Sequence, residues 1–494
     1  MNAQIYRTAT LGVDIGTTGC RSIVYNDQAE LVASSEKLYP TNSPKTGWAE
    51  QDPSVVISKV EESIQEAVAR AKVGGYEVML ISFSAVNHGI IPMRGGQPLR
   101  PCIIWADNRS TGIIEAWKEE GLKEEFYQRT CCPLHPMYLP GKLAWLRQFE
   151  PSVFGETERF ISLKELLFYR WFGKYVVDTS IATSSGLYNV HQMTWDEEIL
   201  RRIGVRADQL SEIVPTTTVF EGLKEEVLIK LGLDSKVKVV IGAGDGVLSS
   251  LGAGAIDPGE VTVMIGTSGA ARITVDKPTL DRLGRTWCYY LSPNAWVVGG
   301  AINNAGLTLQ WVRQNWLHGI SFEEVEKLAA TTRTGSDGLM LMPFLTGERS
   351  PNWNSDIRAA LIGLDFAHGP GHFARAAMEG VAYRIRSVYE PIQEMAGKVT
   401  SLRIGGGFMA SPTWVQIVAD VLNQPLEALG EPQGSAFGAV LLAWLSLGKI
   451  SALSESRRFM KVDRVIKPQK AQVELYNSEY IKYKELYDKI YVSL

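Results

Sequence analysis

A short glycine-threonine segment occurs twice in this chain, and its repetition constrains the fold more than any other feature. IGTTG stands at 15–19 and IGTSG at 265–269, so the two copies begin 250 residues apart. Each copy follows a β-rich run and precedes another, which predicts the turn of a β-hairpin. Two such hairpins near the starts of the two halves of a chain predict two related subdomains that face one ligand.

The chain is long enough for both subdomains. Its 494 residues, 45% apolar and 21% charged, predict either two large domains or about three of average size. We place the boundary near 250, where the segment GDGVLSSLGAGA is expected to form a helix that links the halves. The predicted domains are therefore 1–250 and 251–494.

Composition excludes several function classes. The net charge is −4 and there is no polybasic block, so a small-molecule partner is expected rather than nucleic acid or an anionic membrane. The longest apolar run, residues 436–448, is too short to span a bilayer, and the first ten residues lack the apolar core of a signal peptide. Five scattered cysteines without a C-x-x-C pair fit a reducing cytoplasm.

The secondary-structure pattern is of the α/β class. Residues 8–39 predict an antiparallel meander, and Asp52 followed by Pro53 predicts the start of a helix. Further strands are expected at 77–84, 236–244 and 401–407, and further helices at 304–317, 371–397, 411–422 and 434–447. Five tyrosines at helical spacing are expected to form a packing stripe near the end of the chain: Tyr476, Tyr480, Tyr483, Tyr487 and Tyr491.

The two hairpins carry the groups that bind phosphate. Glycine lets backbone N–H groups approach an oxyanion closely, and threonine or serine hydroxyls add donors. Asp14, at a strand end, could hold Mg²⁺ through its water shell. Read alone, either segment could be a plain β-turn, but the second copy favours phosphate binding. No G-x-x-x-x-G-K-[ST] segment is present, which excludes a P-loop.

A third glycine cluster, Gly405 to Gly407, ends a predicted strand. It is followed by Ser411, which is a candidate N-cap for the next helix. Such glycines let a nucleobase or ribose lie against the backbone. The alternative is a tight strand-to-helix turn without a ligand.

These segments occur together with others that are typical of one family. DIGTT with Arg21, GDG at 244–246, IGTSG, GERSPNWN at 347–354 and the run at 360–383 resemble the FGGY family of carbohydrate kinases. The resemblance covers about residues 8–450. SFSAVNHG, CIIWADNR, HPM and SLKELL look most like bacterial gluconate kinases.

The resemblance implies an α/β fold of two actin-like, RNase-H-like domains with mixed central sheets and ATP in the cleft between them. It implies that Asp245, in G-D-G, is the general base that accepts the sugar hydroxyl proton, although an Asp there could also cap a helix. Asp14 would position Mg²⁺. The residues expected to bind ATP are Thr17, Thr18, Arg21, Gly266, Thr267, Ser268, Gly306, Gly406, Gly407 and Ser411.

The sugar pocket is expected in the first half. Asn87 and His88 follow a predicted strand where related kinases place substrate-facing polar residues, and Trp105 and Asp107 end the run CIIW. A lone His is more often structural, and Trp105 could equally belong to the core.

A sugar acid also needs a cation for its carboxylate. In the motif regions the candidates are Arg109 and Lys164, each of which could instead be a surface charge.

The leading hypothesis is an ATP- and Mg²⁺-dependent kinase that converts gluconate to 6-phosphogluconate. A kinase for a ketopentose such as xylulose is the nearest alternative, because the ATP half does not distinguish sugars. A nucleotide-switched binding protein like actin or the heat-shock chaperones is an alternative of another class. The resemblance is also compatible with a homodimer.

Overall fold

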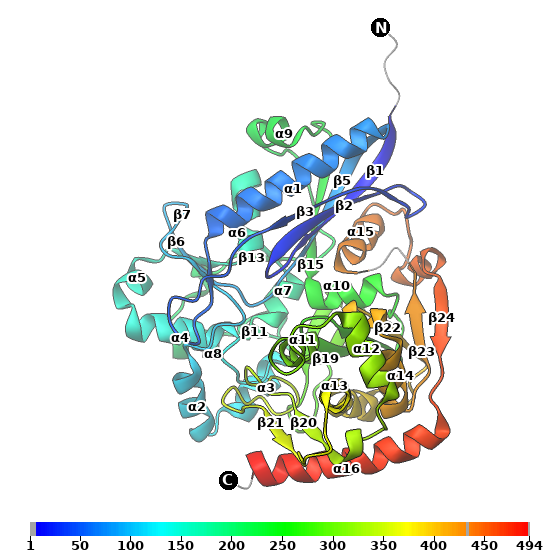
Figure 1. Cartoon of the computed structure of the whole chain (residues 1–494). Helices are drawn as coiled ribbons and strands as arrows, with labels where there is room; N and C mark the ends of the chain where they lie inside the picture. The colour runs from blue at the N-terminus through cyan, green and yellow to red at the C-terminus, as the bar shows by residue number, and fades with distance from the viewer. Residues whose placement is uncertain (1–5, 431–433, 493–494) are drawn as a thin grey trace.

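The computed structural model describes residues 6–430 and 434–492, which form two lobes, each built on a mixed β-sheet (Figure 1). The first five residues, which are part of the segment predicted to lack a signal peptide, lie outside the described range. Within the described residues no helix is both long and apolar enough to cross a membrane.

The strands of the first half are β1 (Arg7–Ile15), β2 (Gly19–Tyr25), β3 (Leu31–Leu38), β4 (Glu50–Gln51), β5 (Tyr76–Ala85), β6 (Ile91–Arg94), β7 (Gln97–Pro98), β8 (Cys102–Ile103), β9 (Arg159–Ile161), β10 (Val176–Asp178), β11 (Tyr188–Asn189), β12 (Thr194–Trp195), β13 (Glu212–Val214), β14 (Val219–Phe220) and β15 (Lys238–Gly244). Those of the second half are β16 (Glu260–Ile265), β17 (Gly269–Val275), β18 (Trp287–Ser292), β19 (Ala295–Ile302), β20 (Met340–Met342), β21 (Ala360–Ile362), β22 (Ser401–Gly405), β23 (Leu426–Leu429) and β24 (Val462–Ile466).

The helices of the first half are α1 (Pro53–Val73), α2 (Thr111–Glu119), α3 (Lys123–Thr130), α4 (Leu139–Phe149), α5 (Pro151–Glu156), α6 (Leu163–Phe172), α7 (Thr179–Ser184), α8 (Glu197–Ile203), α9 (Glu225–Leu231) and α10 (Asp245–Gly252). Those of the second half are α11 (Gly306–Asn315), α12 (Phe322–Thr331), α13 (Pro370–Ala396), α14 (Pro412–Leu422), α15 (Ser435–Ser446) and α16 (Lys470–Tyr491). Short 3₁₀ turns are η1 (Ala207–Gln209), η2 (Ser336–Gly338), η3 (Gly407–Ala410) and η4 (Leu453–Phe459).

The two main sheets repeat one topology. In the first sheet the order β3-β2-β1-β5-β15-β14 has two antiparallel pairings, then two parallel ones, then an antiparallel edge strand. In the second sheet β19-β17-β16-β22-β23-β24 follows the same sequence of pairings, with β18 added beside β19. The hairpin β1–β2 therefore corresponds to β16–β17, which explains why the glycine-threonine turn occurs twice.

Local sequence signals set many of the boundaries. Asp52 accepts the N–H groups of Ser54 and Val55 at the start of α1, with Pro53 in the first turn. The predicted antiparallel meander is confirmed as β1, β2 and β3, and the helices predicted in the second half correspond to α11, α13, α14 and α15. The segment at 245–252 is helical and forms α10. In the chain, α10 lies between β15 of the first sheet and β16 of the second.

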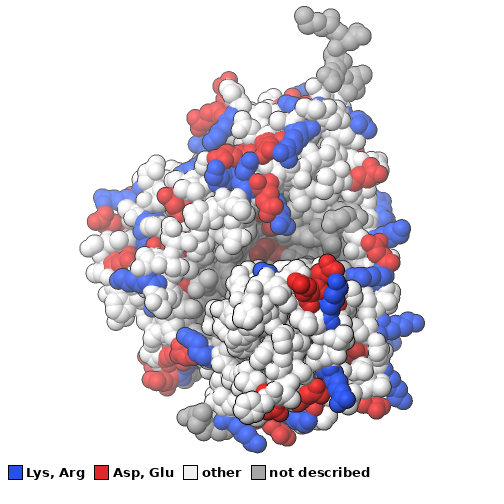
Figure 2. All heavy atoms as spheres, viewed as in Figure 1, with Lys and Arg blue, Asp and Glu red and all other residues white. Residues whose placement is uncertain are grey.

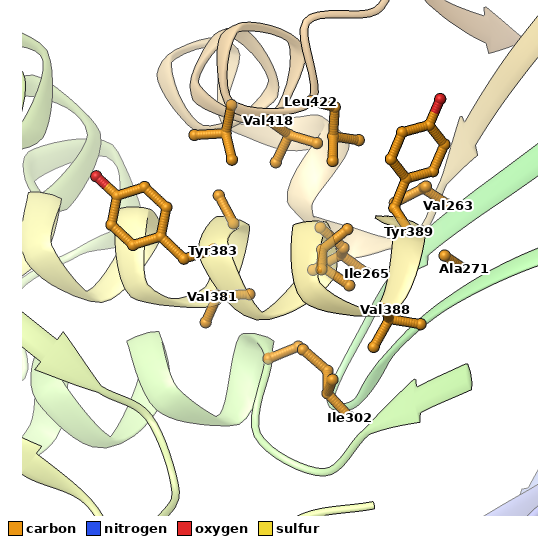
Figure 3. Packing of buried hydrophobic residues seen from close by; sticks show 14 of the residues in the cluster. Val263, Ile265, Ala271, Ile302, Val381, Tyr383, Val388, Tyr389, Val418 and Leu422 are labelled. Carbon is orange, nitrogen blue, oxygen red and sulfur yellow. The ribbon is translucent and has the colours of Figure 1, made fainter. Parts of the chain in front are cut away.

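The core of the second lobe lies on both sides of α13. Figure 3 shows Val381, Tyr383, Val388 and Tyr389 of this helix between sheet residues such as Ile265 and the facing side chains of α14. Four of the five stripe tyrosines on α16 are buried in the same cluster, and Tyr491 is packed partly buried against it. The stripe therefore packs, as its spacing predicts.

The lobes are joined by two helices that pack tightly against each other. α15 lies on β1 and β5 of the first sheet and also along α10. A methyl group added at Gly438 would overlap the carbonyl oxygen of Leu248, and one added at Gly252 would overlap that of Gly434. Only glycine permits this approach of two helix backbones.

Candidate active site between the two lobes

The viewed face of the molecule is hollowed between the two lobes, and basic and acidic side chains are interspersed around the hollow (Figure 2). Asp14 of β1 and Arg272 of β17 are both close enough to Asp245, the residue after β15, to affect the pKa of its carboxyl group.

Both glycine-threonine turns form hairpin tips with free polar groups. In the first, the Gly16 N–H donates to the Gly19 carbonyl at 3.0 Å and Thr18 is exposed. In the second, the Gly266 N–H donates to the Ser268 carbonyl at 2.9 Å and Thr267 is exposed. The predicted hairpin turns are therefore present, and each exposes a threonine hydroxyl that could donate to an anion.

Asp245 is the first residue of α10 and directly follows β15. Gly244 occupies the N-cap position of α10. The alternative that Asp245 caps this helix is therefore wrong. Burial and the nearby Asp14 carboxylate raise the pKa of Asp245 to about 6, although the Arg272 and Arg349 guanidinium groups oppose the rise. A buried carboxylate with a pKa closer to neutrality is suited to general base catalysis.

Asp14 lies at the end of β1, beside Ser84 of the parallel neighbour β5. The Ser84 hydroxyl donates to Asp14 Oδ1 at 2.7 Å. Burial raises the pKa of the Asp14 carboxyl group, and hydrogen bonds from Ser84 and Ser435 limit the rise. Asp14 and Asp245, predicted from separate segments, are thus brought close enough to affect each other's charge.

A cavity of about 670 Å³ lies in the second lobe beside the second hairpin tip. Its wall combines backbone with apolar side chains, which suits a flat ring system. The lining residues are Gly266, Thr267, Gly306, Leu307, Leu309, Gln310, Phe322, Glu323, Val325, Glu326, Met378, Gly407, Phe408, Ala410, Ser411 and Trp414.

The third glycine cluster borders this cavity. Gly406 is not among the lining residues and instead packs under β16, where an added methyl group would overlap the Ile265 carbonyl. Ser411 N-caps α14, because its hydroxyl accepts the Trp414 N–H at 3.2 Å, and it also contacts Glu326. The predicted cap is confirmed, and the same residue lines the cavity.

Two polar atoms without partners lie where the sequence predicts the sugar side of the site. Asn87 Oδ1 and His88 Nδ1 are buried and have no hydrogen-bond partner. His88 has φ +67°, and its ring lies 5.0 Å from that of Tyr138 and 6.2 Å from that of Tyr289. Burial, with the Lys142 and Arg349 charges, lowers the pKa of His88 far below its usual value, so the ring is neutral.

Trp105 connects the sugar side to the first hairpin. Its Nε1 donates to Thr17 Oγ1 at 2.8 Å, and the Arg349 guanidinium lies 4.8 Å from its ring centre. The side chain is therefore shared between the two lobes. The predicted strand CIIW is shorter than expected, since β8 contains only Cys102 and Ile103.

Three predicted residues, Asp107, Arg109 and Lys164, are engaged in buried ion pairs. Asp107 and Arg109 form a fully buried ion pair at 2.8 Å, and Arg109 also pairs with Glu50. Lys164 is buried against Asp178 at 2.6 Å. Their side chains hold loops in place and do not present a cation to a substrate.

Arg21, expected to bind phosphate, is exposed on β2 opposite Asp14. Its Nε pairs with Glu36 Oε1 at 3.0 Å. Its charge still lowers the pKa of Asp14, though less than the serine hydrogen bonds do.

Three site residues were not predicted from the sequence. Arg272 follows the second hairpin on β17, Arg349 lies in GERSPNWN, and Lys142 lies on α4. Lys142 Nζ donates to the carbonyls of His88 at 2.6 Å and Ile104 at 2.8 Å, which joins the two sugar-side loops. The position of Arg349 in GERSPNWN was a usable signal, whereas Arg272 and Lys142 lie outside the quoted segments.

Comparison with known proteins gives a consistent result. The model for the N-terminal domain of the FGGY family of carbohydrate kinases matches residues 9–252, and the model for the C-terminal domain matches 261–447. A gluconokinase of Bacillus subtilis is 38% identical over 90% of this chain and 88% of its own length. A xylulose kinase of the same organism is 30% identical over 97% and 96%.

The similar solved structures also include a xylulose kinase and a gluconate kinase. A ligand-bound xylulose kinase from Lactobacillus acidophilus superposes with a TM-score of 0.94 at 32% identity and 98% coverage of both chains. A gluconate kinase from that organism superposes with a TM-score of 0.93 at the same identity and coverage.

Proposed function

The chain belongs to the FGGY family of carbohydrate kinases, and from this premise we propose that it phosphorylates the terminal hydroxyl of D-gluconate with ATP and Mg²⁺. Family membership makes it a sugar kinase that uses ATP and sets aside the nucleotide-switched binding protein. The observation that carries the choice of substrate is that a gluconokinase is 38% identical, against 30% for a xylulose kinase.

In the proposed mechanism, Asp245 accepts the proton of the sugar's terminal hydroxyl as that oxygen attacks the terminal phosphorus of ATP. The bond from this phosphorus to the bridging oxygen breaks, and ADP leaves. The hairpin tips, through Thr17, Thr18, Thr267 and Ser268, bind the phosphate oxygens. Positioning and charge neutralisation supply most of the catalysis in such transfers. The adenosine moiety would occupy the cavity bordered by Gly306, Gly407 and Ser411.

Asp14 is proposed to hold Mg²⁺. The donor set fits, because Mg²⁺ binds through one or two carboxylates with waters and substrate phosphates. Among the described residues no group of three or more His, Cys, Asp or Glu side chains could hold a metal by itself, which also favours an ion that depends on the nucleotide. When bound, the ion would neutralise phosphate charge.

A substrate panel tests the proposal. With ATP and Mg²⁺ held saturating, kcat/KM is measured for gluconate, xylulose, ribulose and glycerol. We expect gluconate to exceed each neutral sugar by at least about tenfold, since one charge-assisted contact is worth roughly 1.5–3 kcal/mol. A preference for xylulose would replace the proposed substrate by the ketopentose.

The raised pKa of Asp245 predicts that enzyme activity falls on the acid side of its pH profile. Because its pKa is about 6, the carboxylate is present above that pH, and activity should be lost as pH falls through about 6. The measurement is the pH dependence of kcat/KM for the sugar at saturating MgATP, which reports on the free acceptor site.

An Asp245→Glu variant is the control for that profile. Moving the carboxyl group by one methylene changes its burial, so a limb that belongs to this residue should shift. A limb at an unchanged pH would belong to the nucleotide or to another group, and would contradict the assignment.

A further inference from the structure

Arg349 is a half-buried cation that forms no ion pair with a carboxylate among the described residues. It lies in the loop between β20 and β21. Its guanidinium donates once, to the Ile302 carbonyl at 3.1 Å, and its Nε is buried without any hydrogen-bond partner. One face lies over the Trp105 ring at 4.8 Å.

The adjacent glutamate opposes the lowering of the Arg349 pKa by burial but forms no ion pair with the guanidinium group. Glu348 Oε1 accepts the backbone N–H groups of Asn303 at 2.7 Å and Arg349 at 2.9 Å. Its Oε2 lies 3.5 Å from Nε of Arg384, which is itself buried. A partly buried cation without an ion-pair partner is costly in a folded protein, so its retention points to an anion that arrives with a ligand.

The groups around Arg349 are those of the sugar side. Its charge lowers the pKa of His88 and of His135, although burial is the main reason that both rings are neutral. It also interacts with the side chains of Tyr138 and Tyr289. Those two hydroxyls hydrogen-bond each other at 2.8 Å. The site therefore combines one free cation with polar groups that suit hydroxyls.

A second unpaired arginine, Arg272, is close enough to Arg349 for the Arg349 charge to lower its pKa. A methyl group added at Gly246, next to Asp245, would lie 3.7 Å from Arg272 Nε, which has no partner either. Arg272 is thus beside the reacting end. The carboxylate and the terminal hydroxyl of gluconate are the two ends of a six-carbon chain. With the hydroxyl at Asp245, the carboxylate therefore needs a cation that lies away from Asp245, on the Trp105 side.

We propose that Arg349 binds the substrate's carboxylate and makes the enzyme selective for a sugar acid over a neutral sugar. This assignment rests on the proposed function. It assigns the cation to the second lobe, although the other sugar-side residues come mainly from the first. A sugar acid would accordingly bridge the lobes, with Asp245 at its hydroxyl end and Arg349 at its carboxylate end.

The test compares gluconate with D-gluconamide, its neutral analogue of the same chain length. For Arg349→Met we expect kcat/KM for gluconate to fall by about 10²-fold, because a buried charge loses its partner. The value for gluconamide should fall at least about tenfold less, so that the wild-type preference for the acid collapses. KM for ATP should stay within about threefold.

Two further variants complete the design. Arg349→Lys keeps the charge and should retain part of the preference, which covers the case in which Arg349→Met does not fold. Arg358→Met is the matched control, because this exposed arginine bonds only to nearby carbonyls in its own loop. It should leave both substrates unaffected.

The outcomes separate the two proposals. If the wild-type enzyme does not prefer gluconate over gluconamide and xylulose, the proposed function fails. If it does, but Arg349→Met keeps that preference, only the assignment of Arg349 is overturned. A rise in KM for ATP with an unchanged preference would likewise overturn it, since the guanidinium would then bind phosphate.

Discussion

Asp245→Asn is expected to lower kcat by at least roughly 10²-fold and to leave nucleotide binding nearly intact. The change keeps the shape of the side chain and removes the group that accepts the hydroxyl proton. Burial and the Asp14 charge raise the pKa of Asp245 to about 6, and the Arg272 charge opposes the rise. Asparagine introduces no buried charge there, so folding should be preserved.

Turnover and ATP affinity must be measured on the same preparation. Single-turnover phosphorylation gives the chemical step, and calorimetric titration gives the dissociation constant for ATP. Asp257→Asn is the matched control, since Asp257 is a half-exposed carboxylate paired with Arg457 at 2.6 Å. Near-normal turnover in Asp245→Asn would remove this residue from the role of base.

Gly438→Ala is expected to destabilise the protein by at least about 2 kcal/mol, which is large for the addition of one methyl group. The added carbon would overlap the Leu248 carbonyl, so α15 and α10 would have to separate. These helices join the lobes, and Asp245 begins one of them. The thermal midpoint should fall by at least about 2 °C, because the unfolding entropy of a chain of this length is large.

Gly155→Ala is the control for that prediction. Gly155 is in α5, and a methyl group there would meet nothing within 4 Å. Alanine favours helix over glycine, so the variant should be neutral or up to about 1 kcal/mol more stable. If Gly438→Ala has the same midpoint as the wild type, the close contact between α10 and α15 is wrong.

Several parts of the site could be read from the sequence because their signals are local. A glycine-threonine turn between β-rich runs forms a hairpin by its own backbone preferences, and Ser411 followed by Pro412 starts a helix in the same way. Residues that depend on distant partners were harder to assign. Arg109 and Lys164 are in the predicted regions, but their charges are paired with Asp107 and Asp178.

The sequence by itself determined the two hairpins, the main strands and helices, and the family, because each depends on residue order over short stretches. Only the tertiary structure decided which charges remain unpaired. Arg349 and Arg109 look alike as residues in a motif, yet one lies against Trp105 without a carboxylate and the other is enclosed by two. Burial and ion pairing depend on segments that folding brings together, so no local pattern could distinguish them.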